Sequence, residues 1–299
     1  MTDLVIRKIP FEFDRSVPFN WQPENPIFSA FCNLVSFGVV SFEKYIISVV
    51  RMAQDKFVDP EIAAEAQAFL RQEAQHASAH RKHMLALIEQ YPALEDAYQH
   101  AVASYEELLA AHDLEFHLSY IANIEGCFAP LLKVVLDHRE ALLEPGDQRV
   151  ASLMMWHFVE EIEHRSSGLV LYQYLTPNRW TRTKYAPQTF KHSATVTQHI
   201  AAEIDRVVPE SDRVISLVDA MKVKMPRLTR SQRTKTGVPA PFHAVPTRNI
   251  ASMLWWLFLA QLPHHDPTNQ PVPESADLWM REYARGTDMT AFCGTPVLK

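Results

Sequence analysis

Glycine and cysteine are scarce in this sequence, and each scarcity excludes a class of structure. Only 7 of the 299 residues are glycine, which indicates few tight turns and suits long helices. The three cysteines, Cys32, Cys127 and Cys293, form no CxxC pair and are odd in number, so no disulfide framework is expected. Reduced thiols predict a cytoplasmic protein, with Cys127 as a small core residue.

Several targeting and catalytic motifs are also missing. The sequence has no glycine-rich phosphate loop and no GxSxG nucleophile elbow, and its first residues lack the pattern of a signal peptide. The longest apolar stretch outside the predicted bundle, residues 250–262, has 13 residues, whereas a bilayer span needs about 20. We read it as a buried helix, or through Trp255, Trp256 and Phe258 as the edge of an apolar entrance, and expect no membrane span.

Positive charge is in deficit as well. The chain has 29 Lys and Arg against 35 Asp and Glu, a net charge of −6, which argues against general nucleic-acid binding. Six Lys and Arg residues gather in residues 221–235. We interpret this segment as a solvated basic loop rather than an anion-binding patch.

The remaining pattern is helical, so the predicted fold class is all-α. Residues 1–25 read as an extended segment, residues 26–176 as a ferritin-like four-helix bundle, and residues 177–299 as a C-terminal helical extension. Asp59-Pro60-Glu61 is typical of a helix start, and Pro130 should kink its helix. Helices are predicted over 25–54, 59–90, 93–110, 112–143, 147–175, 188–206, 210–222, 246–262 and 275–286.

A repeated pattern of metal-ligating side chains runs through the predicted bundle. A lone Glu43 is followed by Glu73-x-x-His76, and a lone Glu125 by Glu161-x-x-His164. Residues three apart share a helix face, so each Glu/His pair can contact one ion. A bundle that holds two metal ions takes one Glu from each of two helices and a Glu-x-x-His from each of the other two.

The surroundings of these residues separate the pattern from coincidence. Glu-x-x-His should occur about once by chance in a chain of this composition, so the motif alone proves little. However, Glu125 lies in a stripe with Leu118, Ile121 and Leu132, and the other three Glu residues also lie on apolar faces. Four buried carboxylates need countercharge, which two divalent cations would supply. The competing explanations are buried salt bridges or a misjudged helix phase.

Additional histidines share the faces of the ligand pairs. His157 lies four residues before Glu161, and His80 lies four after His76. Each could be a further ligand, could hydrogen-bond a ligand, or could be a neutral core histidine. We count His157 among the metal ligands and expect His80 and Glu160 to support them. Glu163 is predicted to point away into solvent.

The sequence resembles the bacterial "predicted metal-dependent hydrolase" family of ferritin-like proteins over residues 5–260. The resemblance is carried by Arg71 to Arg81, by Trp156 to Arg165, and by the segments around Glu43 and Glu125. Phe42 replaces a Gly that is usual in the family, and Gly126-Cys127 stands where members often have His. The ligand set also resembles that of di-iron carboxylate oxygenases, and His157 resembles a third His of arylamine N-oxygenases.

Our leading hypothesis from the sequence is a non-haem di-iron enzyme that activates O2 to hydroxylate, desaturate or N-oxygenate a small, apolar organic substrate. Glu73 and Glu161 would bridge the irons, whereas Glu43 and Glu125 would be terminal ligands. The ligands also suit Fe/Mn or Zn. The alternatives are a dinuclear metal-dependent hydrolase and a ferroxidase or iron-handling protein. An oxygenase would need an electron donor, and a homodimer is possible in bundles of this kind.

Overall fold

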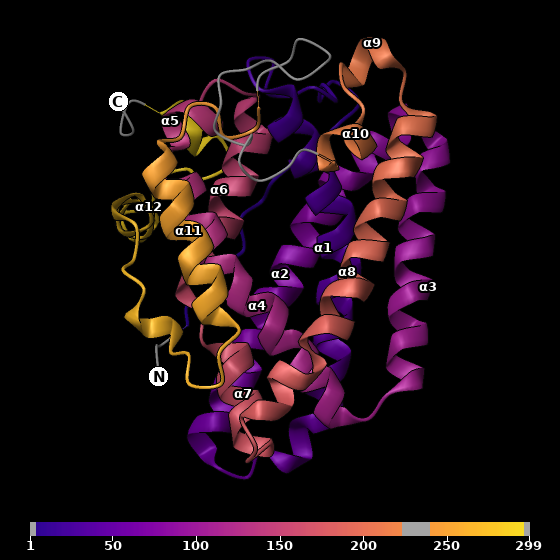
Figure 1. Ribbon diagram of the computed structural model, residues 1–299. Coiled ribbons are helices and arrows are strands. Elements are labelled where there is room, and N and C mark those ends of the chain that lie inside the picture. Colours follow the sequence, from indigo (N-terminus) through magenta and orange to yellow (C-terminus); the bar gives the residue numbers. More distant parts are fainter. Residues whose placement is uncertain (1–3, 223–239, 296–299) are drawn as a thin grey trace.

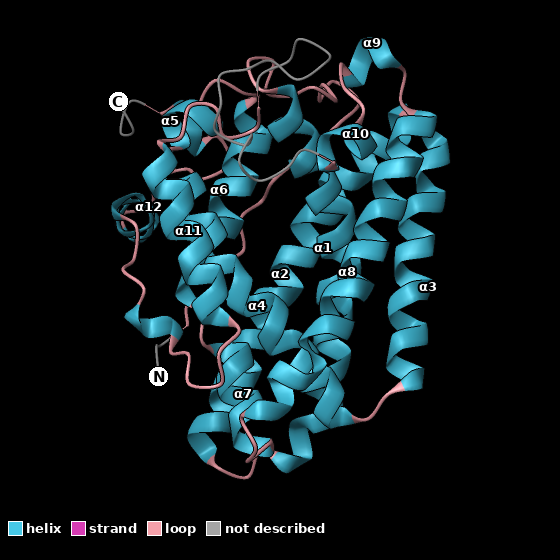
Figure 2. Cartoon of the chain, in the orientation of Figure 1, coloured by secondary structure: helices cyan, strands magenta, loops and turns pink. Residues whose placement is uncertain are grey.

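The computed structural model describes residues 4–222 and 240–295, and the described part of the chain is helical without strands (Figures 1 and 2). The all-α prediction is therefore confirmed. Residues 4–25 precede the first helix and are not helical. Most of the basic segment at residues 221–235 lies outside the described residues, so the interpretation as a solvated loop stays a prediction.

Four helical segments form the bundle, and an Asn or Asp side chain caps the start of each. Asn25, Asp59, Asp113 and Asp147 each accept a backbone N–H from the first turn of the helix that follows, which satisfies donors that have no partner within the helix. The pairing of α1 with α2 and of α4 with α6 and α7 buries the apolar faces. The helices are α1 (Pro26–Ala53), α2 (Pro60–Gln90), α4 (Leu114–Asp137), and α6 (Gln148–Glu163) with α7 (Ser167–Leu175).

The fourth bundle helix is interrupted, which corrects the prediction of one helix over 147–175. It stops after Glu163 and resumes at Ser167. Ser and Gly are poor helix formers, and the sequence there is Ser166-Ser167-Gly168. A Cβ at Gly168 would lie 3.2 Å from Cγ of Glu125, so the small residue lets the two helices approach closely. The predicted helix over 112–143 is also divided, because α5 (Arg139–Leu142) is separate, whereas α4 continues through Pro130. The predicted kink at Pro130 stays a prediction.

The remaining helices cover the flanks of the bundle. The connecting helix α3 (Glu95–Ala111) lies beside α1, and α8 (Trp180–Val207) packs against α3, α4 and α1. In Figure 1, α3 and α8 stand on one side, while α11 and α12 stand on the other. The prediction placed the start of α8 eight residues too late, because Pro187 lies inside the helix rather than before it. The other segments are α9 (Glu210–Arg213), α10 (Leu217–Met221), α11 (Thr247–Ala260), α12 (Glu274–Ala284), and short 3-10 turns at Gln54–Lys56, Pro92–Leu94, Pro267–Asn269 and Phe292–Gly294.

The α11 helix is not the buried helix that its apolar sequence predicted. It packs on α4 through Ile250, Met253 and Ala260, which are buried. Its other face is open, since Trp255 is 59% and Phe258 is 56% exposed. The rest of the protein therefore covers only one side of this apolar helix.

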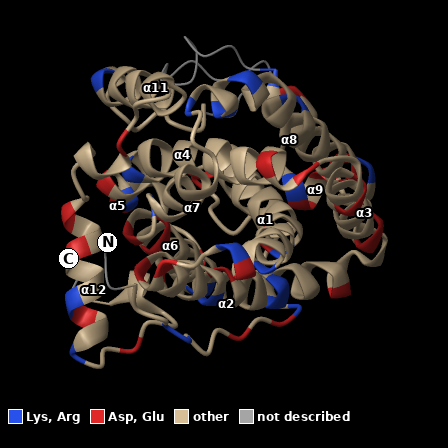
Figure 3. Ribbon diagram, turned by 90° about the horizontal axis from the view of Figure 1, so that it is seen from below, with Lys and Arg blue, Asp and Glu red and all other residues tan. Residues whose placement is uncertain are grey.

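Burial explains the apolarity of the two central helices. Pro26–Lys56 and Leu114–Asp137 are long and apolar enough to cross a membrane, but 78% of the most apolar window of each is buried inside the protein. A helix that is apolar on most of its faces belongs in the centre of a protein or a bilayer, and here the other helices surround it. Lys, Arg, Asp and Glu lie mostly on outer faces in the end-on view of Figure 3.

We predict that Gly146→Ala destabilises the protein, because the added Cβ would lie 2.5 Å from carbons Cε3 and Cζ3 of the buried Trp21 ring. Overpacking of this kind costs about 1–3 kcal/mol. Urea denaturation would measure the loss in free energy of unfolding. The matched control is Gly38→Ala, whose Cβ would meet its nearest neighbour only at 4.0 Å and should leave stability unchanged or slightly raised. Equal stability of the two variants would contradict the prediction.

Candidate metal centre

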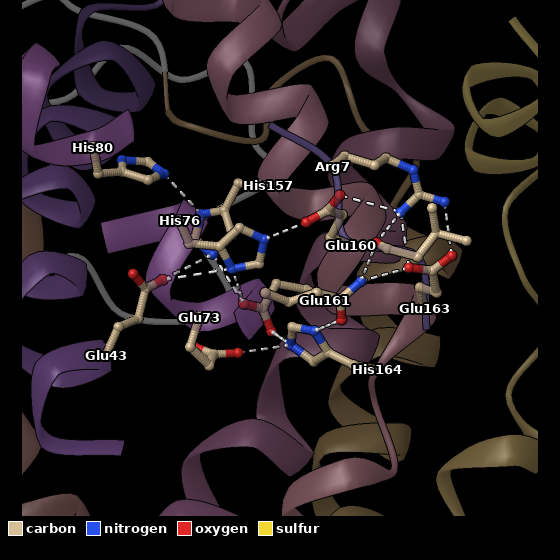
Figure 4. Close-up of polar contacts among 12 residues, drawn as sticks. Arg7, Glu43, Glu73, His76, His80, His157, Glu160, Glu161, Glu163 and His164 are labelled. Atoms are coloured by element: carbon tan, nitrogen blue, oxygen red, sulfur yellow. Dashed lines mark hydrogen bonds and ion pairs between the residues drawn. The ribbon is translucent and has the colours of Figure 1, made fainter. Parts of the chain in front are cut away.

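The bundle helices bring all seven predicted ligands together in the core, and each of them is buried. Figure 4 labels all of them except Glu125. They come from every bundle helix, and the last one follows directly after the end of α6. Because the spacing of three keeps each Glu/His pair on one helix face, the helices direct these side chains inward. The seven are Glu43, Glu73, His76, Glu125, His157, Glu161 and His164.

Four of these side chains form a first donor group. Glu43, His76, His157 and Glu161 each present one ligand atom, and these atoms all lie within 4.8 Å of one another. His157 Nε2 is 2.9 Å from Glu161 Oε1 and 3.5 Å from Glu43 Oε1. His76 Nδ1 is 3.7 Å from the same two oxygens. Two carboxylates and two imidazoles around one point are a suitable donor set for a divalent metal ion.

A second donor group shares one residue with the first. Glu73, Glu161 and His164 present ligand atoms within 4.8 Å of one another. His164 Nε2 is 3.0 Å from Glu161 Oε2, 3.3 Å from Glu73 Oε1 and 3.6 Å from Glu125 Oε2. Glu161 thus turns Oε1 toward the first group and Oε2 toward the second, which suits a bridging carboxylate. Glu73 reaches only the second group, so its predicted bridging role stays a prediction.

Several donor atoms fit a cation because they have no hydrogen-bond partner among the described residues. Both carboxylate oxygens of Glu43, Glu73 and Glu125, and Nδ1 of His76, are buried without a hydrogen bond among the described residues. Buried polar groups are almost always paired, and an unpaired buried carboxylate is costly. This buried cluster therefore supports a dinuclear metal site.

The pKa values of the four buried carboxylates show that the chain itself supplies too little positive charge to compensate them. Burial, together with the neighbouring carboxylates, raises the pKa of Glu43 well above its usual value, and burial raises that of Glu125 to about 7. Burial also dominates for Glu73, whose pKa is raised despite the opposing His164. For Glu161, burial is outweighed by His164 and His157, which lower its pKa. The histidines thus compensate the negative charge of Glu161, but the pKa values of the other three carboxylates remain raised.

Two ligand histidines are oriented by hydrogen bonds on their outer nitrogens. His76 Nε2 donates to Glu160 Oε2 at 2.9 Å, and His164 Nδ1 donates to Gln72 Oε1 at 3.0 Å. In each case the other ring nitrogen faces the donor groups. Outer partners of this kind fix the tautomer and ring orientation of a metal-ligating histidine. Glu160 therefore hydrogen-bonds a predicted ligand, and its supporting role at a metal centre stays a prediction.

Arg7 of the N-terminal segment connects these two supports. Its guanidinium donates to Glu160 at 3.1 Å and to both oxygens of Glu163 at 2.8 Å, and Gln72 Nε2 also donates to Glu163 at 2.6 Å. The prediction that Glu163 points into solvent is therefore wrong. A charged partner from outside the bundle holds it inward, where its side chain is only 10% exposed.

The other predicted supporting residue, His80, lies behind His157. His80 Nε2 and His157 Nδ1 are 2.9 Å apart, and Ser36 Oγ is 2.9 Å from Nδ1 of both His80 and His83. If His157 Nδ1 donates a hydrogen bond to His80, then His80 donates to Ser36 and Ser36 donates to His83. In that tautomer His157 Nε2, which lies beside Glu161 Oε1 in the first donor group, carries no proton and can act as a ligand atom.

Sequence reasoning missed Arg7, Gln72, Ser36 and His83. A signal existed for His83, since it continues the stripe of Glu73, His76 and His80 along α2. No local signal existed for Arg7, because its carboxylate partners lie more than 150 residues away in the chain.

Comparison with known proteins bears directly on this site. The family model described as "Predicted metal-dependent hydrolase" matches residues 5–239. The chain belongs to this family. The match includes every residue of both donor groups as well as Arg7, and it confirms the resemblance seen in the sequence. A search of the curated proteins and a search of the solved structures each found no match. Helices α11 and α12 lie beyond the residues that the family model matches.

We predict that Glu161→Ala removes both metal ions, because Glu161 belongs to both donor groups. Glu73→Ala should remove only one, since Glu73 belongs to one group. The number of metal ions per chain, measured by inductively coupled plasma mass spectrometry after loading and desalting, distinguishes the two variants. Glu140→Ala, at a side chain that is 75% exposed, serves as the control and should load fully. Two ions retained by Glu161→Ala would show that the ligand assignment is wrong.

We also predict that Arg7→Met weakens metal binding without touching a ligand. Loss of one partner of a buried ion pair costs about 3–5 kcal/mol of stability, and loss of an outer support typically costs about 10–100-fold in metal affinity. Competition with a chromophoric chelator would measure the affinity. The matched control is Arg15→Met in the same segment, whose side chain is 68% exposed and pairs with an exposed Glu89. If both variants bind metal equally well, Arg7 does not support the centre.

Proposed function

We propose that this protein is a dinuclear iron enzyme that uses O2 to oxidise a small organic substrate. The observation that carries the proposal is the composition of the two donor groups, which together with Glu125 offer four carboxylates and three imidazoles in the core of a helical bundle. Four carboxylates with two of these imidazoles, those of His76 and His164, are typical of di-iron and di-manganese carboxylate proteins, and His157 would be an additional ligand. Structural zinc sites, in contrast, favour thiolates and imidazoles with four ligands in total.

The iron pair, when bound, would supply the activation of O2, and the residues of the chain would control its surroundings. Glu161 would hold the two ions at a fixed separation, because each of its oxygens faces a different donor group. His76 and His164 would be kept in one orientation by Glu160 and Gln72. The burial of every donor would exclude bulk water from the reaction.

The proposal needs further components that the chain does not provide. Many substrates do not supply all the electrons that the reduction of O2 requires, so an electron donor is part of the proposal. A cytoplasmic setting agrees with reduced thiols, since Cys32, Cys127 and Cys293 are free and none forms a disulfide. An iron–manganese pair would use the same ligands.

A second candidate function is metal-dependent hydrolysis, and the family description favours it. That description names hydrolysis directly, and it supports this candidate more directly than oxidation. Two metal ions can lower the pKa of a bound water and clamp an ester, amide or phosphate group. In that case the same donor groups would hold zinc or manganese, and O2 would play no part.

We predict that protein purified from iron-supplemented cells contains about two irons per chain and changes its near-ultraviolet spectrum reversibly on reduction with dithionite and exposure to air. Glu161→Ala should lose both the metal and the spectral change, while Glu140→Ala should retain them. Protein that holds two zinc ions, shows no redox response and hydrolyses model esters without O2 would reject the oxidase proposal and establish the hydrolase.

A further inference from the structure

An apolar pocket of about 200 Å³ lies against the candidate metal centre. One wall is α1, where lining residues recur at every third or fourth position from Phe31 to Phe42, and the facing wall is α4 from Ile124 to Val135. Each stripe spans 11 residue steps, or about 16 Å at the rise of an α-helix. The pocket is therefore long and narrow.

The two ends of this pocket differ. Phe42 packs edge-on against Phe128, with ring centroids 6.3 Å apart, which places the Phe42 end of α1 beside the Ile124 end of α4. The residues that follow Phe42 and Ile124 are Glu43 and Glu125, so this end lies at the metal centre. Phe31, at the opposite end, is 37% exposed. The pocket thus leads from the surface to the donors, and His157 and Glu161 form part of its lining.

The chemistry of the lining excludes a ligand that carries charge along its length. Within the described part of the chain, Glu161 and His157 are the only ionisable side chains of the pocket apart from Tyr105, and no Lys or Arg lines it. Two hydroxyl groups come from α8, of which Thr197 already donates to the Ser193 carbonyl at 2.8 Å. The walls offer apolar contact and few hydrogen bonds, so apolar area and shape determine what binds.

We infer that this pocket binds an unbranched aliphatic chain of about 8–10 carbons, with the end that reacts beside His157 and Glu161. The length follows from the stripes and the volume, since a cavity of about 150 Å³ holds benzene and this one is larger and elongated. As a substrate assignment the inference rests on the proposed function, but binding of the chain does not depend on the reaction. A primary alcohol of this length is a suitable neutral probe.

Calorimetric titration with straight-chain primary alcohols of increasing length tests this inference. Zinc-loaded protein under nitrogen is used, so that neither O2 nor turnover enters the measurement. Affinity should rise about fourfold for each added CH2 and level off when the pocket is full. The compact 1-adamantanol should bind about tenfold or more weakly than 1-decanol, because it overpacks a narrow space. Affinity that is independent of chain length, or equal for the two alcohols, would overturn the inference.

Two threonines of α8 provide a matched pair of variants. Thr197 lines the pocket and Thr195 is exposed, and each donates its hydroxyl to the carbonyl four residues earlier in the helix. Thr197→Leu should lower the affinity for 1-decanol about tenfold and shift the plateau to shorter chains, whereas Thr195→Leu should change neither. Identical titrations for the two variants would overturn the inference.

A third variant keeps the test independent of any single substitution. Gly38 lies in the pocket wall on α1, and its nearest neighbour to an added Cβ is 4.0 Å away, so Gly38→Leu should fold and fill the pocket. It should reproduce the shorter plateau of Thr197→Leu. An unchanged chain-length profile in folded Gly38→Leu would count against the pocket. If alcohols bind as expected but iron-loaded protein shows no reaction with O2, the pocket stands and the oxidase proposal fails.

Discussion

Four carboxylates are buried side by side in the centre of this protein, and the rest of the structure depends on how their charge is compensated. Glu43, Glu73, Glu125 and Glu161 lie in the core, each at most 3% exposed. An uncompensated buried charge costs several kcal/mol even after relaxation, which is a large share of the stability of a whole domain. Histidines offset the charge of Glu161 but leave the other three raised in pKa. Two divalent cations would resolve this conflict, and the bundle supplies the donors for them in two groups that share one residue.

The bundle alone does not make this centre rigid. Two of the predicted ligand histidines, His76 and His164, are oriented through Glu160 and Gln72, and both of these lead to Arg7, either directly or through Glu163. Arg7 lies in a segment without regular secondary structure and is only 3% exposed. A buried cation thus lies just outside the carboxylate cluster, where it pairs with two acidic side chains that do not face the donor groups. This separation keeps the four inner carboxylates available for metal.

The sequence predicted the inner part of the site better than its supports. The ligands on α2 and α6 were predictable because helix geometry alone places residues three apart on one face. The break after Glu163 was missed, although Ser166, Ser167 and Gly168 signal it, because the apolar stripe continues across the gap. The early start of α8 was missed because Pro187 lies inside the helix rather than before it. The inward direction of Glu163 was missed because it depends on an ion pair with a residue more than 150 positions away.

The contact of Arg7 with α12 has a consequence for the order of events during synthesis. The Arg7 guanidinium carbon lies 5.7 Å from the ring centre of Trp279 and 5.4 Å from that of Tyr283, so residues from near both ends of the chain enclose it. Chains emerge from the ribosome N-terminus first. All seven predicted ligands are therefore synthesised more than 100 residues before Trp279 and Tyr283. The side chains of α12 that enclose Arg7 are thus made long after the residues that Arg7 contacts on α6.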